Sequence, residues 1–153
     1  MTPGSYTELF FLDEATALAA GHRPCGECQR TRFNEFREIW AKANPDLTGE
    51  PRPAATAIDT VLHRERTATS TMALSMCHSV GNLPDGAFVT NDDQTPYLVL
   101  KHRLLRWSPA GYAYPSGGSF RFPARLLTPL SVIRALAAGY SAGIHSSALQ
   151  AIG

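Results

Sequence analysis

The feature that most constrains the fold is a change of residue pattern near Leu83. Before this point, apolar residues recur at the spacing of one helix face over residues 31–44. These residues are Phe33, Phe36, Trp40 and Ala43. After it, residues 86–100 (GAFVTNDDQTPYLVL) contain two β-rich runs, which predicts a hairpin around the NDDQ turn. Helices followed by a small antiparallel sheet indicate the α+β class.

Start and stop signals predict further helices. Asp13 is a good N-cap for a helix over residues 14–20, because its carboxylate can accept from first-turn amides, and Gly21 suits the left-handed C′ position. A closing helix is expected from Pro129 to Gly139. The remaining expected elements are a helix over 57–66, strands over 103–107, 112–115 and 119–123, and a strand-like segment over 6–12. Residues 67–82 show no clear period and predict no regular element.

Size and composition indicate one folded domain. The chain has 153 residues, of which 44% are hydrophobic and 18% charged, as in globular proteins that bury a core. We expect a single domain over residues 1–153. Its parts are a helical unit (1–45), a linker with a short helix (46–82), and an antiparallel sheet with a closing helix (83–153).

Charge and cysteine content exclude several classes of protein. A formal net charge of +1 gives no bulk attraction to nucleic acid or to an anionic membrane, so any basic surface must be local. No apolar run approaches the length of a membrane span, and the N-terminus does not read as a secretory signal. Three cysteines, an odd number, argue against a disulfide-stapled secreted domain. We expect a cytoplasmic protein with reduced thiols and no membrane partner.

The motif that carries chemistry is Cys25-x-x-Cys28, directly after the first predicted helix. Two cysteines at this spacing suit two corners of a tetrahedral zinc site, so Cys25 and Cys28 are predicted metal ligands. A structural site needs four ligands, and possible additional ones are Cys77 and His22. The alternatives are a redox dithiol or two ordinary thiols. The sequence contains no nucleotide-binding or hydrolase motif, so zinc is the only cofactor we predict.

Arginines cluster around this motif and make it a candidate nucleic-acid contact. Arg23, Arg30 and Arg32 are the candidate phosphate-binding residues, since arginines beside a zinc turn can position a nucleic acid without reading its sequence. Glu27 and Glu35 dilute the positive charge, and a solvated helix face is the simpler alternative.

The segment LFFLDEATALAAGHRPCGEC (residues 9–28) resembles the amino-terminal zinc domain of the Ada family of bacterial DNA-repair proteins. The shared features are two phenylalanines, an alanine-rich helix and the run A-G-x-R-P-C-x-x-C, with His22 where that family usually has an aromatic residue. The resemblance implies that Cys25 and Cys28 ligate zinc. In that family the methyl-accepting thiolate belongs to an upstream cysteine pair, and this sequence has no cysteine before Cys25.

The rest of the chain resembles a group of short bacterial proteins that share the TELFFLDEA block and a later WSPAGY motif. Members of that group carry further residues, cysteines included, upstream of the position of Met1. The resemblance therefore implies that this sequence is a shortened version lacking part of its metal site.

These observations predict a zinc-stabilised binding protein that contacts DNA or RNA and is linked to DNA repair, and they leave open whether it has an enzymatic activity. Two alternatives remain open. One is a methyl-accepting DNA-repair enzyme whose nucleophilic cysteine lies in a missing upstream segment. The other is a purely structural or interaction domain.

Overall fold

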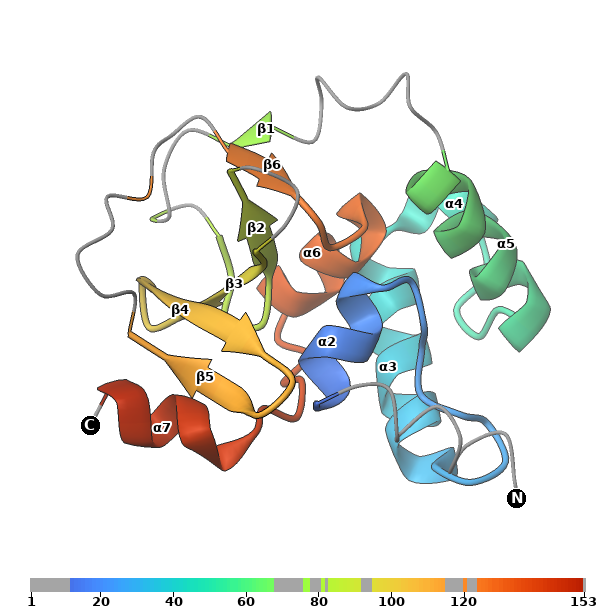
Figure 1. Ribbon diagram of the computed structural model, residues 1–153. Helices are drawn as coiled ribbons and strands as arrows, with labels where there is room; N and C mark the ends of the chain where they lie inside the picture. The colour runs from blue at the N-terminus through green and yellow to red at the C-terminus, as the bar shows by residue number, and fades with distance from the viewer. Residues whose placement is uncertain are drawn as a thin grey trace.

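The computed structural model describes residues 12–67, 76–77, 81, 83–91, 95–114, 120 and 124–152 (Figure 1). The described part combines helices with one antiparallel sheet, so the predicted α+β class is confirmed. The helices are α2 (Glu14–Ala19), α3 (Arg30–Ala43), α4 (Pro45–Thr48), α5 (Ala55–Thr67), α6 (Leu130–Ala137) and α7 (Ser146–Ile152). In the part of the chain that is described, no helix is both long and apolar enough to cross a bilayer.

The sheet of the described residues has six strands in the order β1-β6-β2-β3-β4-β5. They are β1 (Met76–Cys77), β2 (Phe88–Thr90), β3 (Tyr97–Leu100), β4 (Arg103–Ser108), β5 (Gly111–Ala113) and β6 (Ala124–Leu126). The two strands of the predicted hairpin are present as β2 and β3, which pair antiparallel with Phe88 opposite Leu98, while residues 92–94 of the predicted NDDQ turn lie outside the described residues. The next turn, Lys101–His102, has positive φ at both residues (50° and 61°), as a two-residue hairpin turn of type I′ requires.

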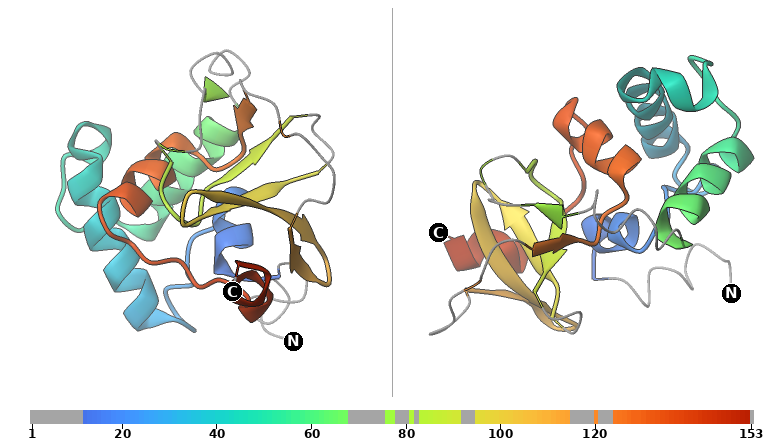
Figure 2. Two further views of the ribbon diagram at one scale, coloured as in Figure 1. Left: turned by 90° about the vertical axis from the view of Figure 1, so that its left-hand side faces the viewer. Right: turned by 90° about the horizontal axis from the view of Figure 1, so that it is seen from above.

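The molecule is layered, with the sheet on one side, α2 and α6 in the middle, and α3, α4 and α5 on the other side (Figure 2). One apolar core lies among α3, α5 and α6, where Phe36 and Trp40 are fully buried. Both faces of the sheet are also packed. One face carries Phe88, Leu98 and Leu105 toward α2 and α7, and the other is centred on Val89 and Val99. Side chains from both halves of the chain therefore share the helical core and the face of the sheet toward α2 and α7, whereas the side chains of the Val89–Val99 face all come from residues 83–133.

Helix α2 begins and ends where the sequence predicts. The carboxylate of Asp13 accepts from the backbone amide of Thr16 at 2.9 Å. At the other end Gly21 has φ 88°, and the amides of Gly21 and His22 donate to the carbonyls of Leu18 and Ala17. This pair of hydrogen bonds is a Schellman motif, which satisfies the last carbonyls of the helix. The chain therefore leaves the helix at Gly21, four residues before Cys25.

Helix α6 is anchored at both ends by groups from elsewhere. Its carboxyl end repeats the Schellman geometry at Gly139, as the sequence predicts. At its amino end the carboxylate of Glu65, from α5, accepts from the backbone amide of Ser131 at 3.0 Å and from its hydroxyl at 2.5 Å. The buried Asn44 side chain joins α3 to α6 by donating to the carbonyls of Trp40 and Ser131. These contacts lock α6 between the helical layer and the sheet.

Some elements differ from the sequence predictions. Helix α7 was not expected, because SSALQAI is short and weakly patterned. A local cap begins it, in which His145 Nδ1 accepts from the Ser147 amide, and a tertiary contact holds it, in which the Ser147 hydroxyl accepts from the Tyr112 amide. Strand β1 lies in the segment predicted to be irregular. The strands expected over 6–12 and 119–123 fall almost wholly outside the described residues.

Gly111 is the position where close packing requires glycine. Its φ is 142°, and a Cβ there would lie 2.7 Å from Ser147 Oγ. Gly111→Ala is expected to lower the free energy of unfolding by about 2–4 kcal/mol, since strained backbone and a steric clash add. Urea denaturation measures the loss. Gly139→Ala is the matched control, because its φ is 116° and nothing lies within 4 Å. An equal loss in both variants would contradict the packing argument.

Glu65 gives a pH dependence of known sign. Burial raises the pKa of this carboxyl, against the hydrogen bonds from Ser131. The folded state therefore binds this proton more tightly than the unfolded state does. The contribution of the protonated carboxyl to the free energy of unfolding is lost as the pH rises from 4.5, the ordinary pKa, through the pKa of Glu65 in the folded state. As the pH rises from about 4 to about 7, the free energy of unfolding of the Glu65→Gln variant should fall by less than that of the parent. Urea denaturation at each pH measures both. The exposed Glu50→Gln controls for removal of one charge, and identical profiles in parent and Glu65→Gln would refute the assignment.

Candidate metal centre

The Cys25–Cys28 turn joins α2 to α3 at one corner of the molecule (Figure 1). The amide of Gln29 donates to the carbonyl of Cys25 at 3.0 Å, and the amide of Phe33 then donates to the carbonyl of Gln29 at 2.8 Å. The turn thus runs straight into the first turn of α3. Cys25 is partly exposed and Cys28 is exposed, and neither sulfur forms a disulfide within the described residues. The structure therefore presents the predicted pair at the surface, beside the amino end of a 14-residue helix.

The backbone of the turn favours the thiolate form of Cys25. The amide of Cys28 donates to Cys25 Sγ at 3.4 Å. Hydrogen bonds from the backbone amides of Cys28 and Glu27 lower the pKa of the Cys25 thiol below its ordinary value. Amides aimed at a sulfur stabilise negative charge there, as does the partial positive charge at a helix amino end. The thiolate is the form of cysteine that binds metal.

Arg23 fixes the entry to the turn. Its guanidinium makes a two-pronged ion pair with Asp59 of α5, at 2.9 and 3.0 Å. It also lies 5.2 Å from the centre of the Phe33 ring, and Arg37 lies 5.0 Å from the same ring. A Cβ at Gly26 would lie 3.6 Å from Phe33, so the ring is also the floor of the turn. Through Arg23, the segment before Cys25 therefore contacts both α3 and α5.

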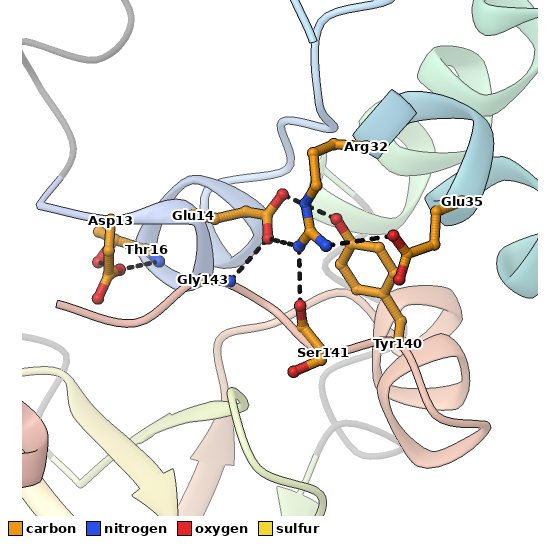
Figure 3. Close-up of polar contacts among 8 residues, drawn as sticks. All are labelled: Asp13, Glu14, Thr16, Arg32, Glu35, Tyr140, Ser141 and Gly143. Atoms are coloured by element: carbon orange, nitrogen blue, oxygen red, sulfur yellow. Dashed lines mark hydrogen bonds and ion pairs between the residues drawn. The ribbon is translucent and has the colours of Figure 1, made fainter. Parts of the chain in front are cut away.

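Arg32 fixes the exit from the turn (Figure 3). Its guanidinium pairs with Glu14 at the start of α2 and donates to the carbonyl of Ser141 at 2.7 Å. Glu14 also accepts from the Tyr140 hydroxyl and from the amide of Gly143, both at 2.7 Å. Burial and the Glu14 charge raise the pKa of Tyr140, so its hydroxyl stays protonated and donates. This cluster joins α2, α3 and the segment after α6.

The three candidate phosphate-binding arginines therefore differ in their surroundings. The guanidinium groups of Arg23 and Arg32 are held by carboxylates of the chain itself. Arg30, the first residue of α3, is exposed. The structure places all three around the turn, and only Arg30 among them points its charge to solvent without a carboxylate partner in the described residues.

The structure brings together two of the predicted metal ligands, Cys25 and Cys28, but not Cys77. Cys25 and Cys28 share the turn, and His22 lies three residues before it, exposed. Among the described residues, His22 included, no three histidine, cysteine or acidic side chains gather closely enough to hold a metal ion. Strand β1, which contains Cys77, lies at the far end of the molecule from the turn (Figure 1). Two cysteines at this spacing can supply two of the four ligands of a structural zinc site, and the described residues place no third ligand beside them.

Several residues that shape the turn were not predicted from the sequence. Glu14, Tyr140, Ser141 and Gly143 all contact one another or Arg32 through the cluster of Figure 3. Glu14 and Tyr140 are 126 positions apart, so no local pattern connects them. The one local signal is Glu14 itself, an acidic residue in the first turn of α2, which the helix dipole alone would explain.

Comparison of the chain with protein-family models, with curated proteins and with solved structures finds no match. The likeness to the Ada zinc domain therefore stays a prediction from the residues quoted above.

The Cys25 thiol should titrate below its ordinary value of 9.0. In a Cys28→Ser/Cys77→Ser variant Cys25 is the single thiol, and the backbone amides of the turn remain as donors. Thiolate absorbance measured against pH is expected to show a midpoint below that of the same variant unfolded in urea. Equal midpoints in the folded and unfolded forms would contradict stabilisation by the turn.

Arg32→Ala should destabilise the fold, while Arg30→Ala should not. Loss of Arg32 leaves Glu14, 19% exposed, without its cation and frees the Ser141 carbonyl. We expect a decrease of about 1–3 kcal/mol in the free energy of unfolding, as for other hydrogen bonds to charged groups. Arg30 is exposed, and its loss should change stability by about 0.5 kcal/mol or less. Thermal and urea denaturation measure both, and similar small effects would show that the cluster is not structural.

Proposed function

We propose that the chain is a zinc-binding protein in which Cys25 and Cys28 hold the metal as thiolates, and that the surface beside them contacts nucleic acid. The observation that carries the proposal is the turn itself: two backbone amides aimed at Cys25 Sγ lower the pKa of that thiol. Zinc would organise the turn as a structural ion, since thiolates are the ligands that structural zinc sites use most.

Thiolate stabilisation also suits a redox dithiol, so the surroundings of the turn matter. In thioredoxin-like proteins the motif follows a β-strand within a β-α-β unit. Here α2 precedes the turn, and the sheet of the described residues is antiparallel. This arrangement favours a structural metal over redox catalysis. Reduced thiols require a reducing compartment, and we place the protein in the cytoplasm for that reason.

Nucleic-acid contact is the second part of the proposal and is carried by Arg30. Its exposed side chain stands two residues after Cys28, at the amino end of α3, where backbone amides also favour a phosphate. Arg23 and Arg32 hold the turn in place through Asp59 and Glu14. A role in DNA repair follows from the resemblance to the Ada zinc domain, which concerns motif and not activity.

The metal is tested first. Protein purified without added metal is analysed for zinc beside the Cys25→Ser/Cys28→Ser double variant. We expect zinc in the parent and none in the variant. Absence of zinc from the parent, even after addition of zinc to reduced protein, would overturn the proposal. Zinc retained by the double variant would place the site elsewhere.

Nucleic-acid binding is tested by its salt dependence. The affinity of the zinc-loaded protein for a labelled DNA duplex is measured at several salt concentrations. Each phosphate contact contributes a slope of about 0.9 in log affinity against log salt, so Arg30→Gln should reduce the slope by about 1. Arg64→Gln, an exposed arginine of α5, is the matched control. Zinc binding without any salt-dependent affinity for DNA or RNA would favour an interaction domain instead.

A further inference from the structure

We propose that a second copy of the chain completes the metal site: Cys25 and Cys28 of two protomers hold one zinc ion between them, so the metal joins a dimer. This inference rests on the proposed zinc binding and adds a partner to it. The number and placement of ligands, the exposure of the turn, and its charge balance each support it.

The first argument is the number of ligands. Structural zinc sites are closed by four protein ligands. The turn supplies two, and the described residues, His22 among them, place no third histidine, cysteine or acidic group close enough to join them. The remaining cysteine belongs to β1, at the opposite end of the molecule (Figure 1). Two copies of the turn supply four thiolates.

The second argument is that the turn is accessible. Residues 27–31 are exposed in an unbroken run, and Cys28 lies within it. The turn occupies a corner of the molecule, away from the sheet (Figure 1). Two such corners can meet at a twofold axis, where each protomer offers the same surface to the other. A zinc ion on that axis receives two ligands from each side.

The third argument is charge. Four thiolates around one Zn²⁺ leave a net charge of −2, and without the metal the thiolates repel one another. Each copy brings two backbone amides directed at Cys25 Sγ, the amino end of α3 and the exposed cation of Arg30, while the exposed carboxylate of Glu27 in the same turn opposes the charge of Arg30. The backbone groups therefore offset part of the excess negative charge, and the metal ion must supply the rest. The contact should therefore form with zinc and come apart without it.

The fourth argument is that the turn is held in place before a partner arrives. Arg23 ties its entry to Asp59, and Arg32 ties its exit to Glu14. Binding costs less when the interacting segment is already ordered, because less conformational freedom is lost. A single ion and a small contact can then suffice to join two protomers.

The decisive measurement is a zinc titration of the full chain, freed of metal with a chelator and kept reduced with a phosphine. Zinc is added in steps with a chromophoric competitor, and molar mass is followed by light scattering after size exclusion. We expect saturation at one zinc for every two chains and a doubling of the mass, reversed by chelator. Saturation at one zinc per chain with unchanged mass would overturn the dimer and leave the proposed zinc binding intact. No zinc uptake would overturn both.

Two variants separate the possible sources of ligands. Cys28→Ser should abolish the change of mass, and circular dichroism checks that the variant remains folded. Cys77→Ser is the matched control, because it removes the remaining cysteine without touching the turn. It should dimerise with zinc as the parent does. If Cys77→Ser loses zinc or the change of mass, the site is closed within one chain and the inference is wrong.

Discussion

The fold depends on the pair of carboxylates at the start of α2. Asp13 caps its own helix through one oxygen, while the other accepts from the Tyr112 hydroxyl and the His145 amide, each at 2.8 Å. Glu14 binds Arg32, Tyr140 and the amide of Gly143. Adjacent residues thus connect one short helix to the sheet, to α3 and to the segment after α6. Partly buried carboxylates are stable only when paired in this way.

This network also explains how an exposed cysteine turn acquires a fixed shape. The turn lies on the ring of Phe33, and residues 27–31 are exposed. Its two ends are instead held by ion pairs to residues of α2 and α5. The amides of Glu27 and Cys28 then stay directed at Cys25 Sγ, which is what lowers the pKa of that thiol. The chemistry proposed for the turn therefore depends on arginines that serve as anchors.

The apolar cores hold the helices and the sheet in place. The α3, α5 and α6 core fixes the helices that carry Arg32 and Asp59, and the two faces of the sheet are covered separately. Because α6 comes from the end of the chain and α3 from its beginning, the helical core forms only when distant segments meet. The Glu65 and Asn44 contacts to Ser131 make that meeting specific.

The sequence by itself determined the α+β class, the caps of α2, the β2–β3 hairpin and the position of the cysteine pair between two helices. These features are local: a capping carboxylate, a glycine with positive φ or a run of β-branched residues acts within a few positions of itself. Tertiary structure alone decided the packing of α7 against the sheet, the placement of β6 between β1 and β2, and the separation of β1 from the cysteine turn. It also decided that Arg23 and Arg32 bind carboxylates of the chain, since Asp59 and Glu14 reach them only through the packing of helices. A local pattern reveals that a side chain is charged, whereas its partner depends on which distant segments the cores bring together.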